Sequence, residues 1–257
     1  MVKLYKNFNI NKNHKGSIIL IGNFDGVHLG HQKLFKLAQS YKKKYSLRIG
    51  VINFDPMPKM FFNQSLKNFR LSSIDQKIDL LDNLGVDFIA TKKFDRTFSK
   101  TKSINFIKNI LYQKLNAKFI FVSNNFRFGN KREGDVNLLI KNEKKYKYKV
   151  VEPKPLSVKQ KVVSSTLIRN LLENGFLEKA NKLLGRNWSI VGIVQKGRQI
   201  GKKIGFPTCN ISIKDYVLAK PGVYAVKVLR KNNSKYIKGI ANLGYRPTFN
   251  QKKILLE

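Results

Sequence analysis

The chain has 257 residues, of which 42% are hydrophobic, so it can bury a core and is not expected to be disordered. It carries 51 Lys and Arg against 15 Asp and Glu, a net charge of +36, which favours anionic partners. No apolar run approaches the ~20 residues of a membrane helix, and the polar N-terminus lacks the apolar stretch of a signal peptide. We therefore expect no membrane partner. Because the single cysteine, Cys209, excludes an internal disulfide, we also expect a cytoplasmic protein.

The strong positive charge has two explanations. Lys, Asn and Ile are abundant along the whole chain rather than in one segment, as a proteome-wide bias in composition would produce. An RNA-binding surface would give the same net charge, but aromatic residues do not cluster with the basic ones and no RNA-binding signature accompanies them. We therefore favour compositional bias and expect no specific nucleic-acid partner.

Strand-like and helix-like patterns alternate over the first two thirds of the chain. Short apolar runs predict strands at 18–21, 47–54, 88–90, 118–122 and 148–151. Apolar residues at helical spacing predict helices at 32–45 and 104–111. Ser73 and Gln76 form a capping-box pattern that opens another helix, which Gly85 ends. This alternation predicts an α/β fold, a parallel sheet covered by helices on both faces.

The pattern changes near Gly185. Two short helices are predicted at 166–173 and 177–184, and the helical period then disappears. Strands are predicted at 188–194, 223–229, 236–243 and 254–256, with a turn at 231–234. We therefore predict two domains, residues 1–185 and residues 186–257, the second a small all-β, barrel-like unit.

The loop after the first predicted strand is the strongest local signal. It reads GNFDGVHLGH over residues 22–31 and leads into a predicted helix. Its glycines let the backbone approach a phosphate, and the helix start offers free N–H groups. His28 and His31 can point at one triphosphate and stabilise the charge that develops on it. The ATP-binding residues predicted in this loop are Gly22, Asn23, Phe24, Asp25 and Gly30, and for Asn23 and Asp25 a metal contact is the alternative.

Several segments resemble one known family. The string His28-x-Gly30-His31 resembles the signature of the nucleotidyltransferase superfamily, and Phe24-Asp25-Gly26 ahead of it is similar to the FAD synthetase branch. Three further matches follow in the family's order: Phe54-x-Pro56-x-Pro58, with Met57 where His is usual; Phe126-Arg127-Phe128-Gly129; and Ser164-Ser165-Thr166-x-Ile168-Arg169. From about residue 18 to 185 the chain thus resembles the bacterial bifunctional riboflavin kinase/FAD synthetases, which implies a Rossmann-like nucleotidyltransferase domain.

The resemblance implies a role for two of these segments. Ser164, Ser165 and Thr166 would hold the β- and γ-phosphates at a helix start, although an ordinary N-cap has the same sequence. Arg169 would add a forked phosphate contact as a catalytic residue beside His28 and His31. The implied flavin-binding residues are Asn125, Phe126, Arg127, Phe128 and Gly129. Two alternatives stay open: the two phenylalanines can equally fill the core, and Asp25 is also typical of a turn.

The β-rich part carries a second set of matches. Gly201-x-x-x-Gly205-Phe206-Pro207-Thr208-x-Asn210 resembles the riboflavin kinase signature, and residues 242–248 resemble a second kinase segment. The resemblance implies that Gly201 and Gly205 wrap ATP phosphates while Thr208 and Asn210 offer oxygens to Mg²⁺. Cys209 replaces the family's Ala, and we expect it to be buried and inert. Taken alone, these segments are also typical of barrel turns.

Glu257 aligns by spacing with the family's catalytic base, which acts on the riboflavin hydroxyl, and it is the last residue of the chain. The family continues beyond this point, so we expect a truncated barrel with an open sheet edge. A terminal residue also tends to fray. We therefore expect weak or absent kinase activity.

The expected function is transfer of AMP from ATP to FMN, which gives FAD and pyrophosphate, with Mg²⁺ as cofactor and ATP, FMN and riboflavin as ligands. Three alternatives stay open. They are an adenylyltransferase acting on another phosphorylated acceptor, a basic RNA-binding module, and a catalytically silent relative. The sequence predicts no oligomeric state.

Overall fold

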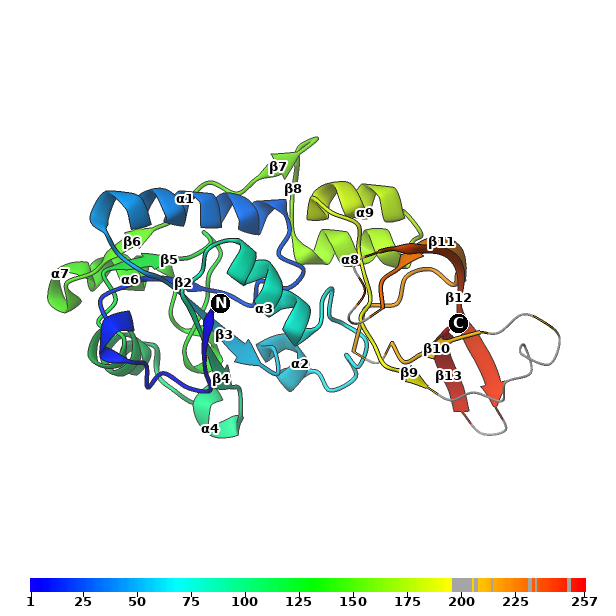
Figure 1. The fold of residues 1–257 in the computed structure, drawn as a ribbon. Helices are drawn as coiled ribbons and strands as arrows, with labels where there is room; N and C mark the ends of the chain where they lie inside the picture. Colours follow the sequence, from blue (N-terminus) through cyan, green and yellow to red (C-terminus); the bar gives the residue numbers. More distant parts are fainter. Residues whose placement is uncertain (196–204, 206–207, 214, 231–232, 234, 249–250) are drawn as a thin grey trace.

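The computed structural model describes residues 1–195, 205, 208–213, 215–230, 233, 235–248 and 251–257. Figure 1 shows an α/β unit beside a smaller unit built from strands. In the part of the chain that is described, no helix has both the length and the apolar character that crossing a bilayer requires.

The α/β unit is built on one six-stranded sheet in which every neighbouring pair is parallel. Its strands are β1 (Lys3–Tyr5), β2 (Ile18–Ile21), β3 (Ile49–Asp55), β4 (Phe88–Lys93), β5 (Phe119–Phe121) and β6 (Lys149–Val151). The order across the sheet is β1-β4-β3-β2-β5-β6. The predicted parallel sheet is therefore confirmed. Of its strands, only β1 was not predicted, because its three residues at the sheet edge are too few for a periodic pattern.

Helices cover both faces of this sheet (Figure 1). The predicted helices are found as α1 (Leu29–Tyr45), α3 (Ile74–Asn83), α8 (Ser165–Glu173), α9 (Leu177–Leu184) and the pair α5 (Ser103–Asn105) and η2 (Phe106–Lys114), the last in π-helical geometry. The remaining elements are η1 (Lys12–His14), α2 (Pro58–Phe62), α4 (Arg96–Ser99), η3 (Asn130–Arg132), α6 (Val136–Lys141), α7 (Glu143–Tyr146), β7 (Ser157–Val158) and β8 (Lys161–Val162). The capping box of Ser73 and Gln76 is formed as predicted.

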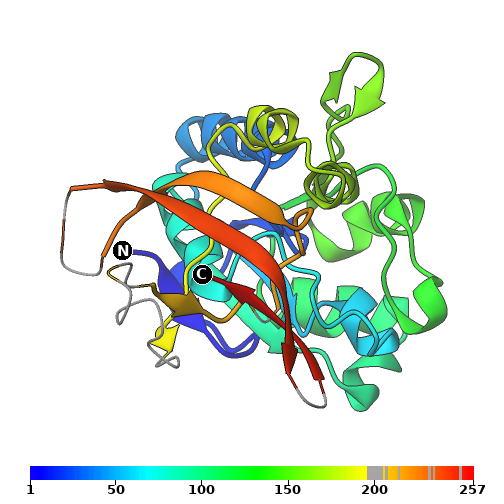
Figure 2. The ribbon, with the colours of Figure 1, turned by 90° about the vertical axis from the view of Figure 1, so that its right-hand side faces the viewer.

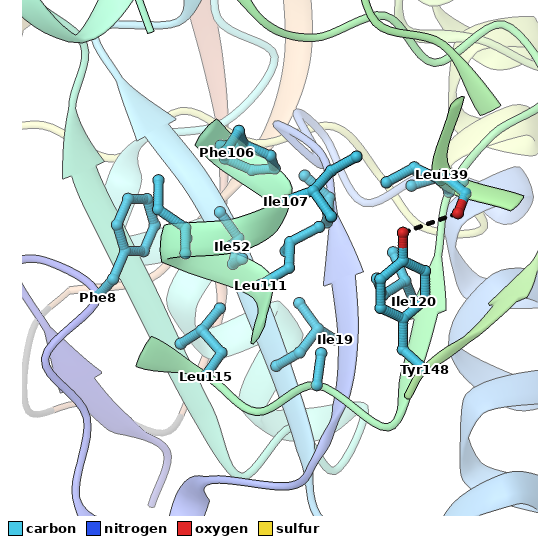
Figure 3. Packing of buried hydrophobic residues seen from close by; sticks show 14 of the residues in the cluster. Phe8, Ile19, Ile52, Phe106, Ile107, Leu111, Leu115, Ile120, Leu139 and Tyr148 are labelled. Carbon is cyan, nitrogen blue, oxygen red and sulfur yellow. Dashed lines mark hydrogen bonds between the residues drawn. The ribbon is translucent and has the colours of Figure 1, made fainter. Parts of the chain in front are cut away.

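Alternate residues of the strands feed two separate cores. Ile18 of β2 packs in one core with Phe35 of α1, whereas its neighbour Ile19 packs in the other with Ile107 of η2. Figure 3 shows the second core, in which the hydroxyl of Tyr148 donates to a backbone carbonyl at 2.7 Å. Because successive strand residues point to opposite faces, a sheet buried on both sides needs continuous apolar runs. That is why those runs predicted the strands.

The second unit is an antiparallel sheet in the order β11-β12-β13-β10-β9. Its strands are β9 (Val194–Gln195), β10 (Asn210–Ile211), β11 (Gly222–Val228), β12 (Ile237–Thr248) and β13 (Gln251–Leu256). The strand predicted at 188–194 is wrong for all but its last residue, because Trp188 turns toward the α/β unit and its indole N–H donates to Leu71 O. Most of the turn predicted at 231–234 lies outside the described residues.

A third core joins the two units. It contains Leu71 from the α/β sheet region, Ile168 and Leu184 from α8 and α9, and Val217 and Leu243 from the β unit. Figure 2 shows the long strands of the β unit lying in front of the α/β unit. The two units are thus packed through a shared apolar core rather than joined by a free linker.

Gly50, in the middle of β3, has no room for a side chain. A Cβ there would lie 2.1 Å from the ring of Phe88. Gly50→Ala should therefore reduce the free energy of unfolding by about 1–3 kcal/mol through overpacking. Urea unfolding of this variant checks the prediction, and Phe88→Leu in the same chain should restore part of the loss. Gly239→Ala, whose Cβ would meet nothing closer than 3.7 Å, is the matched control.

Candidate functional site

The loop after β2 lies at the topological switch point of the parallel sheet. β2 pairs with β3 on one side and with β5 on the other, so the chain leaves β2 and β5 at the same edge. In open α/β sheets, ligands bind outside the carboxyl edge at the point where the strand order reverses. The predicted ATP loop after β2 and the predicted flavin loop after β5 are therefore neighbours by topology.

The loop at 22–28 has an unusual backbone. Phe24, Gly26 and Val27 have φ angles of 47°, 76° and 37°. A positive φ is rare for a β-branched residue such as valine, and strained backbone of this kind gathers at functional sites. The side chain of Phe24 is buried against Phe35 of α1, which anchors the loop to the core.

His28 and His31 form one stacked pair at the start of α1. Nδ1 of His28 accepts a hydrogen bond from the backbone N–H of His31 at 3.4 Å, so His28 is the N-cap of α1. The two rings stack with centroids 3.6 Å apart. A Cβ at Gly30 would lie 3.1 Å from the His28 ring and 3.2 Å from Val163 O, so glycine lets the starts of α1 and α8 approach each other.

Both imidazoles are neutral near pH 7. Burial, assisted by the positive charges of Arg169 and Arg186, lowers the pKa of His28 to about 4. Burial and the neighbouring His28 lower the pKa of His31 well below its ordinary value. Because Nδ1 of neutral His28 is an acceptor, its proton lies on Nε2, which is a hydrogen-bond donor. The protein therefore presents His28 as a neutral hydrogen-bond donor rather than as an imidazolium.

Asp25 and Arg169 form a buried ion pair. Nη2 of Arg169 donates to Asp25 Oδ2 at 2.5 Å, and the two side chains are 9% and 7% exposed. Asp25 also accepts the backbone N–H of Leu71 at 3.0 Å. Arg169 Nε donates to Phe69 O at 2.6 Å, and its guanidinium lies 3.6 Å from the centre of the Phe69 ring. Arg169 was expected to make a forked contact to phosphate, but its Nε and Nη2 donors are already used within the protein.

The Ser-Ser-Thr segment lies at the start of α8, where the alternative of an ordinary N-cap is realised. Ser164 is an ordinary N-cap, whose hydroxyl accepts from Leu167 N at 3.2 Å. The hydroxyl of Ser165 donates to Asp25 O at 2.9 Å, and Thr166 is exposed. Helix α8 therefore begins against the loop that carries the histidine pair.

Three polar side chains that were not predicted from the sequence hold this loop. Arg186 donates to Gly26 O at 2.7 Å, and Gln32 donates to the carbonyl of Val27 at 2.9 Å. Lys77 is buried on α3 and donates to the carbonyl of Asn23 at 3.4 Å, and burial lowers its pKa to about 8. Single basic or amide residues carry no motif in a chain with 51 Lys and Arg, so the sequence held no signal for them.

Asn23 and Gly22 complete the loop. The Asn23 side-chain oxygen is buried and, within the described residues, has no hydrogen-bond partner. Nδ1 of His31 is likewise buried and has no hydrogen-bond partner among the described residues. Buried polar atoms without partners are rare in proteins and call for a ligand or water. A Cβ at Gly22 would lie 3.1 Å from the Phe24 ring, so the loop is closely packed there.

The predicted flavin loop is partly core. Phe128 is buried beside Phe106, whereas Phe126 is half-buried and stacks on Phe128 with ring centroids 5.4 Å apart. Asn125 and Arg127 are exposed; Oδ1 of Asn125 accepts from a serine hydroxyl, and Arg127 lies 3.2 Å from an aspartate. The positive φ of Gly129, 78°, closes the loop. Met57, where the family has His, is buried at the N-cap of α2.

The predicted kinase residues meet where β10 lies beside β13. Thr208 Oγ1 donates to Glu257 Oε1 at 2.8 Å. Asn210 is buried, and within the described part of the chain its Oδ1 has no hydrogen-bond partner. Hydroxyl, carboxylate and amide oxygens of this kind are the donors that Mg²⁺ prefers. Gly205 has φ of 85°, and Gly201 lies outside the described residues.

Two expectations for this region are wrong. Glu257 is not frayed: its backbone N–H and C=O both bond to Asn242, at 3.0 and 2.7 Å, because it continues the antiparallel pairing of β13 with β12. Cys209 is exposed rather than buried. It lies next to the buried Asn210, and neighbouring residues of an extended segment point to opposite sides.

A strained glycine loop, two helix starts and a histidine pair at a switch point define a nucleotide-handling α/β enzyme unit with an attached antiparallel unit. The family model for FAD synthetase matches residues 10–167, and that for riboflavin kinase matches residues 184–257. The chain belongs to the family of bifunctional riboflavin kinase/FMN adenylyltransferases. Both units of that family are present.

Relatives cover nearly the whole chain. The bifunctional riboflavin kinase/FMN adenylyltransferase of Buchnera aphidicola from Schizaphis graminum is 43% identical over 97% of this chain, which spans 80% of that relative. The Escherichia coli K12 protein of the same name is 38% identical over 91% of this chain and 74% of its own length. A crystal structure from Streptococcus pneumoniae, called a macrolide-efflux protein, has a TM-score of 0.86 at 25% identity over 99% of this chain and 83% of its own.

The lowered pKa of His28 predicts an acid-dependent loss of stability. Its pKa is about 4 when folded and ordinarily 6.5, so between these values the unfolded chain binds more protons and stability falls as pH falls. His28→Asn keeps an N-cap acceptor but cannot titrate. Urea unfolding at pH 7 and pH 5 should show that this variant loses about 2 kcal/mol less than the parent protein. Equal losses in the two proteins would contradict the assigned burial of His28.

Asp25→Asn should strongly destabilise the α/β unit. The change leaves the buried guanidinium of Arg169 without a counter-charge, which costs about 3–5 kcal/mol. Lys149→Met, which breaks the exposed pair with Glu143, is the control and should cost at most about 1 kcal/mol. Denaturant unfolding compares the two variants, and similar losses would contradict the importance of the buried pair.

Proposed function

We propose that residues 1–185 form the FMN adenylyltransferase unit and residues 186–257 the riboflavin kinase unit. In the first reaction a phosphate oxygen of FMN attacks the α-phosphorus of ATP. A bond forms between them, the bond to the β-phosphate oxygen breaks, and pyrophosphate leaves with the electron pair. The stacked imidazoles of His28 and His31, held where α1 and α8 begin, are the observation that carries this proposal.

The triphosphate would lie across the two helix starts. Free backbone N–H groups there attract anions, and the neutral His28 offers an Nε2–H donor without first having to bind a proton. A donor fixed before the reaction stabilises charge as it moves onto the leaving pyrophosphate. The proposed ATP-binding residues of this unit are Gly22, Asn23, Phe24, Asp25, Gly30, Ser164, Ser165 and Thr166.

Arg169 would act mainly as a fixed positive charge behind the loop. Its Nη2 and Nε atoms are bonded to Asp25 and to Phe69 O, so its charge rather than a forked contact would face the nucleotide. Asp25 correspondingly serves the site by holding the loop and Arg169. In this proposal the two residues serve ATP binding as a unit.

The flavin would meet the loop after β5. Phe126, half-buried and stacked on Phe128, offers a ring edge or face to a flat ligand. Phe128 itself is committed to the core. Asn125, Arg127 and Gly129 are the polar and backbone elements of the same loop, next to the strand that carries the histidine loop.

The kinase unit would hold Mg²⁺ through Thr208 and Asn210. The unpartnered Oδ1 of Asn210 and the hydroxyl of Thr208 fit a metal that takes oxygen ligands. Bound Mg²⁺ would neutralise charge on the ATP phosphates. Glu257, anchored beside Thr208, would accept the proton of the riboflavin hydroxyl, and Gly201 and Gly205 would line the phosphates.

Product analysis tests both reactions. The purified chain is incubated with Mg·ATP and either FMN or riboflavin, and the flavins are separated chromatographically. FAD formed from FMN supports the adenylyltransferase proposal, and FMN formed from riboflavin supports kinase activity despite our expectation. The absence of both products would favour a catalytically silent relative or a different phosphorylated acceptor.

His31→Ala should abolish FAD formation, with a loss of at least about 100-fold in kcat, because it removes one donor from the charge-stabilising pair. Lys33→Ala, an exposed change on the same helix, is the control and should leave the rate unchanged. Thermal unfolding verifies that both variants are folded. Unchanged turnover in a folded His31→Ala protein would remove the proposed role of His31.

A further inference from the structure

Residues 69–73, here called the bridging segment, are bonded to the nucleotide site. The backbone N–H of Leu71 donates to both carboxylate oxygens of Asp25 at 3.0 Å. The carbonyl of Phe69 accepts from Arg169 Nε at 2.6 Å. The bridging segment therefore supplies a donor to one member of the buried ion pair and an acceptor to the other.

Other backbone groups of the same segment are bonded to the kinase unit. The N–H groups of Phe69 and Arg70 donate to Asp215 O at 3.0 and 2.7 Å. Val217 N donates to Arg70 O at 2.8 Å, so residues 215–217 run along the bridging segment like an added strand. These bonds join segments about 145 residues apart in the chain, so they are long-range tertiary contacts and not part of one local loop.

Two side chains of the kinase unit complete the attachment. The indole Nε1 of Trp188 donates to Leu71 O at 2.9 Å. The hydroxyl of Tyr216, which is buried, donates to Gln76 Oε1 at 2.7 Å. The same Oε1 accepts from Ser73 N and so closes the capping box of α3.

Along residues 69–72, bonds to the Asp25–Arg169 pair and bonds to the kinase unit are interleaved. Leu71 is the clearest case, since its N–H faces Asp25 and its C=O faces Trp188. A peptide group is planar and rigid. In the group that joins Arg70 to Leu71, the C=O accepts from Val217 N and the N–H donates to Asp25. In the group that joins Leu71 to Ser72, the C=O accepts from Trp188 and the N–H donates to Asp25 Oδ1 at 3.4 Å, so in each group the two bonds cannot move independently by much. The position of the Asp25 carboxylate, and through it of Arg169, is therefore set jointly by the two units.

We propose that the kinase unit positions the nucleotide site of the adenylyltransferase unit through the bridging segment, with Trp188 and Tyr216 as positioning residues. The inference rests on the proposed function for the identity of that site, but the geometric coupling does not depend on turnover. Two residues from Trp188, Arg186 donates to Gly26 O in the histidine loop, which gives a second path to the same loop.

The three histidines of the chain provide a direct test. Trp188→Phe removes the N–H donor but keeps an aromatic ring. We expect the imidazole NMR signals of His28 and His31 to shift in this variant, because Arg169 and Arg186 act on His28. His14, which stacks on Phe88 beneath the sheet at 4.7 Å, should keep its signals and is an internal control.

Tyr236→Phe is the matched control variant. Tyr236 belongs to the kinase unit and is 64% exposed, so the loss of its hydroxyl should move none of the three histidine signals. Tyr216→Phe should act like Trp188→Phe. Shifts of His28 and His31 alone would support the coupling. Unchanged signals in both Trp188→Phe and Tyr216→Phe, or equal shifts of all three histidines, would overturn it.

Kinetics supply a second measurement. Removal of one hydrogen bond of ordinary strength should lower kcat for FAD formation roughly fivefold in Trp188→Phe, with the KM for FMN unchanged and no change in Tyr236→Phe. An unchanged kcat would overturn the positioning role while leaving the proposed function intact. A parent protein that makes no FAD would overturn the proposed function, and the histidine signals would still decide the coupling.

Discussion

The buried ion pair of Asp25 and Arg169 is the interaction on which the proposed nucleotide site depends. Each charge loses most of its water, which costs several kcal/mol, and further hydrogen bonds to both members offset part of that cost. Asp25 receives backbone N–H groups of the bridging segment, and Arg169 donates to a carbonyl of the same segment. The requirement to satisfy both charges therefore holds the histidine loop, the bridging segment and α8 in one arrangement.

That arrangement explains how a basic protein keeps its histidines neutral. His28 lies among positively charged guanidinium groups and away from water, and both conditions oppose a further positive charge. The same surroundings favour an anion. A bound triphosphate would bring negative charge next to the imidazoles. The proposed site thus combines the fixed positive charges of its arginines with neutral histidines.

Much of the α/β unit could be predicted from the sequence, because its signals are local. The run at 18–21 is β2 residue for residue, and Ser73 and Gln76 form the predicted capping box. Failures have equally physical reasons. The segment at 188–194 has strand composition, but Trp188 bonds to the other unit. Glu257 was expected to fray, but pairing with Asn242 across the sheet holds it.

The sequence alone determined the two-unit order, the parallel sheet and the positions of the histidine and Ser-Ser-Thr motifs, because each depends on residues a few positions apart. Only the tertiary structure decided what those motifs contact. It paired Asp25 with Arg169 across 144 positions and placed the bridging segment between the units. No local pattern encodes such contacts, since a single charged residue is compatible with solvent, a ligand or a partner until folding selects one.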